Sequence, residues 1–329
     1  MEGIAVIRVV DATQPAEARR MAFRMADEIG FTEAARGKLG IVVTEAATNL
    51  LKHAGGGEII LRCPGPQGLE VLAVDAGPGM RSVNECLRDG YSTAGSAGTG
   101  LGAICRLSAH SDIYSVEGKG TVVQAFCGSG VATAPMSELW DVASVMAPLK
   151  GETVSGDAVA MRETGPMIHL MVVDGLGHGP LAADAAQAAR RAFSATEGSP
   201  RQIVDEIHAR LRSTRGAAVA VAEIDSERGR VRYCGIGNIA GLIATGENTQ
   251  HMVSMSGIAG HQAVRMREFE YRWARPSIVV MHSDGVSSRW QFSTYAGLAG
   301  KRASMVGAVL FRDWRKMNDD ATILVGRQK

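Results

Sequence analysis

The segment VTEAATNLLKHAGGG carries a carboxylate and an amide at a spacing that suits proton transfer and ion binding. Glu45 and Asn49 are four residues apart in a pattern of helical spacing, so both side chains project from one face of the predicted helix. A carboxylate can accept a proton from an attacking hydroxyl group, and an amide oxygen suits a hard ion such as Mg²⁺. One helix face therefore offers a base and an ion ligand together, although either residue alone would more often belong to a solvated surface.

A further aspartate and two groups of glycines follow in the same half of the chain. Asp75 ends an apolar run before AGPGM, where its carboxylate can accept a hydrogen bond from an exocyclic amine. Gly77 and Gly79 allow the backbone to approach a flat base closely. The segment GSAGTGLGA precedes a predicted helix whose free N–H groups would face an anion. Gly98, Gly100 and Gly102 of this segment stand at the start of the predicted helix. It is not a Walker A loop, because no Lys-Ser/Thr pair follows.

Aspartates in the second half of the chain stand beside apolar runs. They are Asp157 in VSGDAVA, Asp174 in VVDGLGHG, Asp284 in HSDGVSS, and Asp319 with Asp320 in NDDAT. Isolated Asp-Gly pairs are usually turns. However, if DAVAMRE and MIHLMVVD form a hairpin around ETGP, Asp157 lies opposite about Val172. Alternation then places Asp157 and Asp174 on one face, near each other.

The remaining aspartates extend this predicted cluster. Asp174 and Asp284 both end apolar strands and precede glycine, which exposes a backbone carbonyl as a further oxygen donor. Asp319 and Asp320 lead directly into the final strand. Clustered acidic groups repel one another unless a cation is present, and ligands that are all oxygen suit Mg²⁺ or Mn²⁺ rather than zinc or copper. We therefore expect an ion site, and a chemistry different from that of the first half.

Helices and strands that hold these residues are predicted from hydrophobic periodicity. In the first half, IAVIRVV, EIILRC and LEVLAVD are strands, EARRMAFRMADEIG and EAARGKLGIVVTEAATNLLKHA are helices, and SDIYSVEGKGTVVQAFC is a hairpin that turns at residues 117–120. In the second, helices are predicted at residues 181–193 and in QIVDEIHARLR, among many strands. With 329 residues we expect two α/β (α+β) domains, at residues 1–127 and 136–329, joined by the linker 128–135, GSGVATAP.

Composition excludes several classes of protein. Lys and Arg total 35 against 34 Asp and Glu, for a net charge of +1, and no basic run with interleaved aromatic residues indicates nucleic-acid binding. Five cysteines without CxxC or metal-ligand spacing are expected to be reduced thiols. No apolar segment is long enough to span a membrane and no targeting segment is recognised, so we expect a cytoplasmic protein without a membrane partner.

The order and spacing of the motifs in the first half resemble the ATP-binding domain of the GHKL family, which includes gyrase, histidine kinases and MutL. The N-box corresponds to Glu45–Asn49, the G1 box to DAGPG at residues 75–79, and the G2 box to GTGLG at residues 98–102. Within this family, the chain is most similar to the anti-sigma-type serine/threonine kinases, including stressosome switch kinases. This similarity rests on the short spacing between the boxes and on the string DGYSTAGSAGTGLGAICRLSAHSDIYS. The resemblance covers residues 1–127 and implies a GHKL (Bergerat) α/β sandwich.

That resemblance also implies a role for each matching residue. Glu45 would be the general base on the substrate hydroxyl, Asn49 a Mg²⁺ ligand, and Asp75 the residue that reads adenine. The other ATP-binding positions would be Gly77, Gly79, Gly98, Thr99, Gly100, Leu101 and Gly102. The implied substrate is a Ser or Thr of a small STAS-domain protein.

The second half resembles the SpoIIE-type branch of the metal-dependent (type 2C-like) serine/threonine phosphatases. The strings VSGD, VVDGLGHGPLAA, SDGVSS and DDAT together carry this resemblance, over residues 136–329. It implies an α-β-β-α sandwich and two divalent ions, Mg²⁺ or Mn²⁺, that lower the pKa of a bridging water. The implied metal ligands are Asp174, the Gly175 carbonyl, Asp157, Asp284 and Asp319, with Asp174 bridging the two ions.

Two nearby residues stay open at this level. Asp320 is interpreted as a support for the ligands rather than a ligand. His178 is either a proton donor to the leaving hydroxyl or a residue with a capping or packing role. No arginine is assigned to the phosphate of the substrate.

Together the motifs predict a bifunctional enzyme that phosphorylates a STAS-domain partner and dephosphorylates the same protein or a related one, in a pathway that regulates a sigma factor. In one alternative, the first domain only binds an anti-sigma pathway partner in the presence of ATP. In the other, the second domain senses metal without catalytic turnover.

Overall fold

The chain, described here from a computed structural model, forms two compact units, Met1–Met136 and Ser137–Lys329. The structure describes residues 3–86, 100–132, 137–246, 248–261 and 266–329. Gly98 and Thr99 of the predicted ATP site therefore lie outside the described residues.

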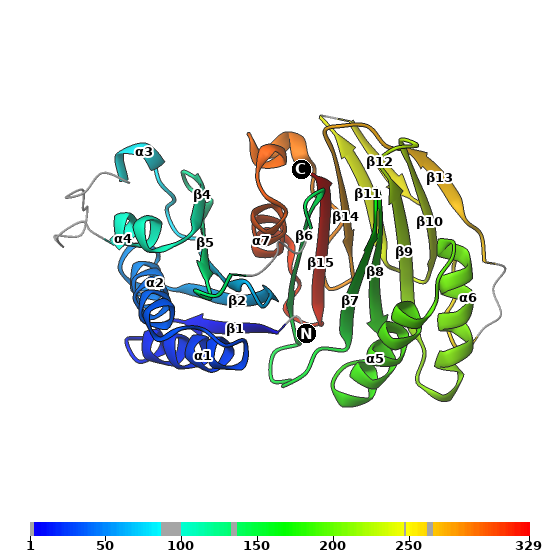
Figure 1. Cartoon of the computed structure of the whole chain (residues 1–329), viewed down its shortest axis with the longest axis horizontal. Coiled ribbons are helices and arrows are strands. Elements are labelled where there is room, and N and C mark those ends of the chain that lie inside the picture. Colours follow the sequence, from blue (N-terminus) through cyan, green and yellow to red (C-terminus); the bar gives the residue numbers. More distant parts are fainter. Residues whose placement is uncertain (1–2, 87–99, 133–136, 247, 262–265) are drawn as a thin grey trace. The chain divides into compact units, whose positions relative to one another are not determined.

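The first unit is a two-layer sandwich of helices on one antiparallel sheet (Figure 1). The strands lie in the order β1-β2-β3-β5-β4, and helices α1, α2 and α4 pack on the same face of this sheet. The elements are β1 (Ile4–Val9), α1 (Gln14–Glu28), α2 (Glu33–Ala54), β2 (Gly57–Gly65), β3 (Gly68–Val74), α3 (Val83–Cys86), α4 (Gly100–Leu107), β4 (His110–Val116) and β5 (Gly120–Gly128). This is the α/β sandwich that the sequence predicts.

Local signals determine where the long helix α2 begins and ends. Thr32 precedes it in an extended conformation, and its side chain accepts a hydrogen bond from the Ala35 N–H. Gly55 ends it at φ 71°, in the left-handed conformation that favours glycine. Leu39, Val43 and other apolar residues of one face pack into the core against the sheet. Glu45 and Asn49 lie outside this core-facing surface of α2, and both side chains are half-buried.

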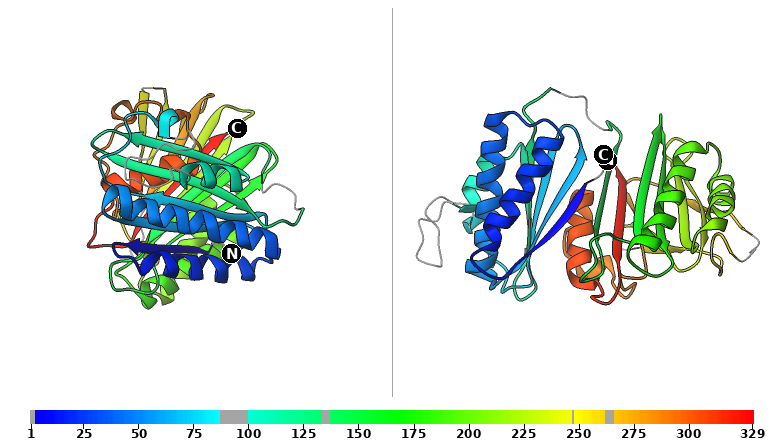
Figure 2. Two further views of the ribbon diagram at one scale, coloured as in Figure 1. Left: turned by 90° about the vertical axis from the view of Figure 1, so that its left-hand side faces the viewer. Right: turned by 90° about the horizontal axis from the view of Figure 1, so that it is seen from below.

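The second unit contains two five-stranded sheets that pack face to face (Figures 1 and 2). Their strand orders are β13-β10-β9-β8-β7 and β12-β11-β14-β15-β6. The elements are β6 (Trp140–Ala147), β7 (Asp157–Thr164), β8 (Met167–Gly175), α5 (Pro180–Ala195), α6 (Pro200–Arg210), β9 (Ala217–Asp225), β10 (Arg230–Ile236), β11 (Ala240–Thr245), β12 (Asn248–Met252), β13 (Phe269–Arg272), β14 (Ser277–His282), α7 (Ala303–Trp314) and β15 (Ala321–Gln328), with short 3-10 turns at Leu211–Ser213, Phe292–Thr294 and Leu298–Gly300.

Helices cover the outer faces of both sheets. Helices α5 and α6 pack on the sheet that contains β8 and β9, through a core rich in alanine and valine. Helix α7 packs on β6 and β15 of the other sheet. A separate core lies between the two sheets and includes Leu170, Val172, Val279 and Leu324. The layers are therefore α-β-β-α, as predicted, although neither α7 nor β6 was expected from the sequence.

The hairpin of β7 and β8 corrects the predicted register. Thr164 pairs with Met167, so the turn consists only of Gly165, at φ 56°, and Pro166. This tighter turn shifts the pairing by two residues, and Asp157 lies opposite Asp174 instead of Val172. Because a shift of two keeps every side chain on its face, the predicted proximity of the two aspartates is retained and becomes a direct cross-strand pair.

A buried ion cluster joins the neighbouring strands β8, β9 and β10. Glu223 on β9 is 2% exposed and accepts two hydrogen bonds from Arg232, at 2.8 and 2.5 Å. His169 Nε2 lies 3.1 Å from the same carboxylate. Burial acts to raise the pKa of Glu223, but the interactions with His169 and Arg232 outweigh it and lower the pKa to about 2.

This cluster predicts a specific pH dependence of stability. Since the pKa of Glu223 is lowered on folding, its stabilising effect is fully present above the ordinary value of 4.5 and is lost as the pH falls through about 2. We expect Glu223→Gln to lower the free energy of unfolding by roughly 2 to 3 kcal/mol at pH 7 and by much less at pH 2. Urea unfolding followed by tryptophan fluorescence measures this unit alone, because Trp140, Trp273, Trp290 and Trp314 all lie in it. The exposed Glu163→Gln is the control, and an equal loss at both pH values would contradict the prediction.

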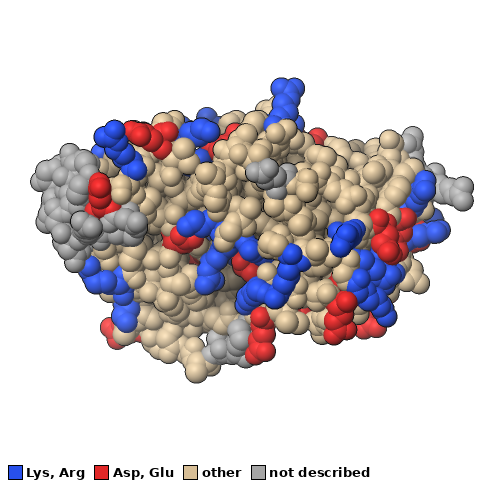
Figure 3. All heavy atoms as spheres, turned by 90° about the horizontal axis from the view of Figure 1, so that it is seen from above, with Lys and Arg blue, Asp and Glu red and all other residues tan. Residues whose placement is uncertain are grey.

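No helix in the described ranges is both long enough and apolar enough to cross a membrane. On the face shown in Figure 3, the described Lys and Arg side chains lie among Asp and Glu side chains. Charges of both signs are therefore interspersed on that face.

Candidate active sites

In the first unit, α2 presents Glu45 and Asn49 to the start of α4. A Cβ added to Gly100, the first residue of α4, would lie 3.0 Å from Glu45 Oε2 and 3.2 Å from Asn49 Oδ1. The two side chains therefore converge on the N-terminal end of this helix, where backbone N–H groups are free to bind an anion. Any side chain at Gly100 would occupy the space between the helix start and the two polar groups.

Asp75 lies across a cavity from these residues, at the end of β3. The cavity has a volume of about 380 Å³, and its lining includes Asn49, Asp75, Gly79, Gly100 and Leu101. Asp75 Oδ1 accepts hydrogen bonds from the N–H groups of Gly77, at 2.8 Å, and Thr121, at 3.1 Å. These bonds fix the carboxylate at the edge of the sheet. Apolar side chains such as Ile104 and Val123 complete the walls, as expected for a pocket that takes a flat base.

The glycines of the AGPGM loop are required by close approach. A Cβ on Gly77 would lie 2.7 Å from the Ala54 Cβ at the end of α2. Gly79 has φ 70°, and a Cβ there would collide with the Val116 carbonyl. Gly102 is buried within α4 and does not line the cavity. The structure thus brings Glu45, Asn49, Asp75 and Gly100 together and places Gly102 behind them.

In the second unit, Asp157 and Asp174 form the centre of an acidic cluster. Asp157 is 4% exposed, and its Oδ2 accepts a hydrogen bond from the Ser283 hydroxyl at 2.7 Å. Its Oδ1 is buried and has no hydrogen-bond partner in the described structure. A buried carboxylate oxygen without a partner is costly unless a cation or a proton satisfies it.

Asp284 and Asp319 approach this pair from two loops that follow β14 and precede β15. Asp284 Oδ2 accepts a hydrogen bond from Asn238 Nδ2 at 2.7 Å, and Asp319 Oδ1 accepts one from the Asp320 N–H at 2.9 Å. Burial, followed by the negative charge of Asp284, raises the pKa of Asp319. The two loops therefore bring their carboxylates into mutual repulsion.

The cluster is electrostatically strained without a cation. Burial and then the charges of Asp157 and Asp284 raise the pKa of Asp174 well above its ordinary value. Burial also raises the pKa of Asp157, and the hydrogen bond from Ser283 only partly offsets this effect. Each carboxylate would release its proton more readily if positive charge entered the cluster.

The donors fit divalent ions such as Mg²⁺ or Mn²⁺ by their chemistry. All are oxygen atoms, which hard cations prefer, and the unpartnered Asp157 Oδ1 is available to bind one. In the described ranges, no group of three or more His, Cys, Asp or Glu side chains already stands in a geometry that could hold a metal ion. Asp284 and Asp319 are instead turned to their hydrogen-bond donors, Asn238 and the Asp320 N–H.

Asp320 has a role in supporting the loops. Its two carboxylate oxygens accept hydrogen bonds from the N–H groups of Leu149, at 2.7 Å, and Gly156, at 2.8 Å, and the residue is 3% exposed. These bonds tie the loop before Asp157 to the loop that carries Asp319. The structure therefore engages Asp320 with backbone and leaves Asp319 facing the cluster.

Gly175 ends β8 directly after Asp174, and His178 lies in the loop that follows. A Cβ on Gly175 would lie 2.2 Å from the Ala182 carbonyl of α5, so the helix start packs directly on this glycine. His178 Nδ1 lies 2.7 Å from Glu152 Oε1, on the exposed side of the loop. The His178 ring is therefore engaged with a carboxylate that the sequence did not single out.

Sequence reasoning missed three polar residues that hold the aspartates. Ser283 donates to Asp157 and accepts a hydrogen bond from the Thr322 N–H at 3.0 Å. Both residues belong to strings already noted, HSDG and DDAT, so their positions gave a usable signal. Asn238 lies in the turn between β10 and β11 and has no comparable signal, because only the fold brings that turn to Asp284.

Comparisons with known proteins match each half of the chain to a known family. Residues 9–126 match the histidine kinase-like ATPase domain family, and residues 165–329 match the Stage II sporulation protein E (SpoIIE) family. The chain is 31% identical over 128 residues to the serine/threonine-protein kinase RsbT of Bacillus subtilis (strain 168), which covers 38% of this chain and 96% of RsbT. It is 23% identical over 142 residues to the phosphoserine phosphatase RsbX of the same organism, covering 42% of this chain and 70% of RsbX.

Two solved structures align with part of this chain. A structure from work on the bacterial stressosome, described as a modular system adapted to control secondary messenger signaling, aligns with a TM-score of 0.54 and 25% identity over 57% of this chain and 99% of its own. The structure of RsbX in complex with magnesium shares the fold, with a TM-score of 0.51 and 19% identity over 59% of this chain and 98% of its own.

These matches define an enzyme that joins a serine/threonine kinase-like ATPase domain to a PP2C-type phosphatase domain, as the sequence predicts. The chain belongs to the SpoIIE family, and its first unit belongs with the RsbT-like kinases of the histidine kinase-like ATPase family. Phosphatases of this family use divalent metal ions, and the related RsbX structure contains magnesium.

Proposed function

We propose that the chain is a bifunctional partner-switching enzyme that acts on a small STAS-domain protein. Residues 1–127 would transfer phosphate from ATP to a Ser or Thr hydroxyl, residues 128–135 would link the domains, and residues 136–329 would remove the phosphate from the same protein or a related one. The names of the relatives RsbT and RsbX, a kinase and a phosphoserine phosphatase, support this pair of activities.

In the kinase reaction, Glu45 accepts the proton of the substrate hydroxyl while the oxygen attacks the γ-phosphorus and ADP leaves. Asp75 accepts a hydrogen bond from the adenine amine across the 380 Å³ cavity. The N–H groups at the start of α4, beginning at Gly100, bind phosphate oxygens. Asn49 holds Mg²⁺, which neutralises phosphate charge when bound.

In the phosphatase reaction, two divalent ions would be held by Asp174 and Asp157 together with Asp284, Asp319 and the Gly175 carbonyl. Such ions lower the pKa of a bound water and polarise the phosphoryl group. Ser283 and Asn238 orient Asp157 and Asp284 through their hydrogen bonds. Mn²⁺ would serve in place of Mg²⁺, because both accept ligands that are all oxygen.

One observation carries the proposal: each unit holds its own group of polar residues, with Glu45 and Asn49 converging on Gly100 in the first and Asp157 paired with Asp174 in the second. Opposed activities on one chain would cycle ATP to waste without regulation. We therefore infer that partner binding or metal concentration sets which activity dominates.

The test uses the full chain, labelled ATP and a purified STAS-domain protein of a partner-switching pathway. We expect label to appear on a Ser or Thr of the STAS protein and to be released when Mn²⁺ is supplied after ATP is removed. Hydrolysis of p-nitrophenyl phosphate stimulated by Mn²⁺ would separately rule out a metal sensor without turnover. ATP-dependent retention of the partner without label would instead support a binding module.

A further inference from the structure

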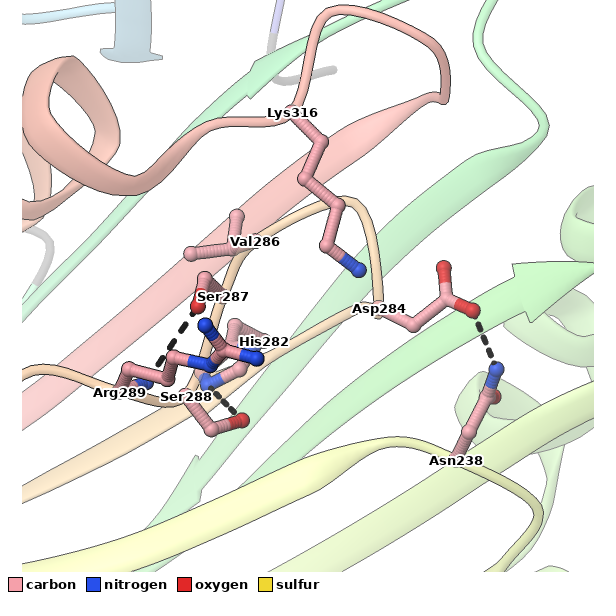
Figure 4. A pocket seen from close by; sticks show the side chains of 8 residues that line it. All are labelled: Asn238, His282, Asp284, Val286, Ser287, Ser288, Arg289 and Lys316. Carbon is pink, nitrogen blue, oxygen red and sulfur yellow. Dashed lines mark hydrogen bonds between the residues drawn. The ribbon is translucent and has the colours of Figure 1, made fainter.

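Two basic side chains line a pocket beside Asp284, on the proposed phosphatase site. The pocket has a volume of about 490 Å³ and is lined by Asn238, His282, Asp284, Val286, Ser287, Ser288, Arg289 and Lys316. In Figure 4 the Lys316 ammonium group extends toward Asp284, and the Arg289 guanidinium group lies on the side opposite the hydrogen-bonded pair of Asp284 and Asn238. Within the described ranges, no ion pair uses Arg289 or Lys316, and both side chains are exposed.

Backbone hydrogen bonds fix the segments that carry these cations. The Lys316 N–H donates to the Gly285 carbonyl at 2.7 Å, and the Ser287 N–H donates to the Trp314 carbonyl at 2.9 Å. Val286 and Arg315 form an antiparallel bridge between the same two segments. The loop after Asp284 is therefore paired through backbone hydrogen bonds with the segment that leads to Asp319. This pairing holds Lys316 near Asp284.

A second cavity borders Arg289. This cavity, of about 420 Å³, shares Ser288 and Arg289 with the first and is also lined by Thr249, His251, Trp290, Gln291, Phe292 and Ser293. Trp290 is 6% exposed and packs edge-on against Phe292, with ring centroids 5.3 Å apart. Arg289 thus lines both the cavity that contains Asp284 and the cavity that contains Trp290 and Phe292.

The charge of the substrate phosphate indicates a role for these two cations. The phosphate of a phosphoserine carries close to two negative charges and would approach four carboxylates, so contacts with positive groups of the protein would oppose their repulsion. A lysine supplies a mobile point charge, and an arginine supplies a planar fork that matches phosphate oxygens. An exposed cation is usually only solvated, but two unpaired cations in one pocket beside the acidic centre form a matched anion site.

We propose that Lys316 and Arg289 form the phosphate-binding subsite of the phosphatase domain, which holds the phosphoryl oxygens of a phosphoserine or phosphothreonine substrate beside Asp284. This inference rests on the proposed phosphatase function. It supplies the contact with substrate phosphate that the sequence left without an arginine. The second cavity then receives the peptide next to the phosphorylated residue.

Inorganic phosphate, the product, is the probe for this subsite. In the full chain loaded with Mn²⁺, the inhibition constant of phosphate and the KM for p-nitrophenyl phosphate are measured together, and calorimetric titration gives phosphate affinity without turnover. We expect Lys316→Gln and Arg289→Gln each to weaken phosphate binding and raise KM about tenfold or more, from the usual strength of charge-assisted hydrogen bonds. Lys316→Arg, which keeps the charge, should stay within about threefold of the wild type.

Arg210→Gln is the matched control, because Arg210 is an exposed cation on α6 and pairs with Glu206 of its own helix. Phosphate affinity and KM within about twofold of wild type in both glutamine variants would overturn the subsite, since a lost charge-assisted contact exceeds that change. A raised KM with unchanged phosphate affinity would also overturn it. Absence of hydrolysis by the wild type would instead count against the proposed phosphatase function, and calorimetry would still test the subsite.

Discussion

Asp174→Asn is expected to abolish phosphatase activity and, at the same time, to stabilise the metal-free chain. Asp174 lies directly opposite Asp157 and is repelled by Asp157, Asp284 and Asp319. Removing one of these charges weakens metal binding, so hydrolysis should fall about a thousandfold or more. It also relieves the repulsion, so the free energy of unfolding without metal should rise by roughly 1 to 3 kcal/mol.

The measurement combines hydrolysis of p-nitrophenyl phosphate with thermal unfolding in the presence of a chelator and with added Mn²⁺. Wild type should gain much more stability from Mn²⁺ than the variant does, because ligand binding to the folded state adds to its stability. Asp184→Asn, at an exposed position of α5, is the control and should change neither quantity. A variant that is less stable without metal would show that Asp174 has a structural role instead. Transfer of label from ATP should be retained in Asp174→Asn, since that reaction belongs to the other unit.

Glu45→Gln is expected to stop phosphorylation of the STAS-domain protein while ATP binding is retained. Glutamine keeps the size of glutamate but cannot accept the proton of the substrate hydroxyl. The rate of label transfer should therefore fall about 10²- to 10⁴-fold, the usual contribution of a general base. Glu45 does not line the cavity that Asp75 and Asn49 share, so calorimetry should give an ATP affinity close to that of wild type.

Glu28→Gln, at the exposed end of α1, is the control for charge alone. Label transfer at the wild-type rate in Glu45→Gln would exclude Glu45 as the base. Loss of ATP binding together with label transfer would point to a role in shaping the start of α4, because Glu45 lies against Gly100. Asn49→Ala separates these roles further, since it should weaken the Mg²⁺ dependence of the reaction without removing the base.

Local sequence signals determined most of the elements that carry the sites. The helix predicted at EAARGKLGIVVTEAATNLLKHA is α2 with the same bounds, because Thr32 and Gly55 define its ends and its apolar spacing is regular. The pairing of Glu45 with Asn49 follows from the helical repeat alone. Apolar runs also located the aspartates at strand ends. Asp174 and Asp284 stand at or just after the end of such a run, and Asp319 stands shortly before the final strand.

Other features depended on contacts between distant segments. Helix α7 was not predicted because residues 303–311 are buried on all sides, which removes the polar face that marks an amphipathic helix. The register of β7 and β8 depended on a turn of two residues where four were expected, and only the pairing shows that Asp157 faces Asp174. A hydrophobic pattern repeats every second residue in a strand, so it fixes the face of a side chain but leaves its exact partner undetermined.

The sequence by itself determined the two enzyme classes, because each motif is a short string of residues that can be recognised locally even though the motifs of one site lie far apart in the chain. Only the tertiary structure decided which groups support them: Asn238 reaches Asp284 from 46 residues away, and Asp320 holds Gly156 from 164 residues away. The same holds for Lys316 and Arg289, which enter one pocket because backbone hydrogen bonds join their segments. Contacts of this kind are made by sheet packing and loop pairing, and no local pattern of residue types encodes them.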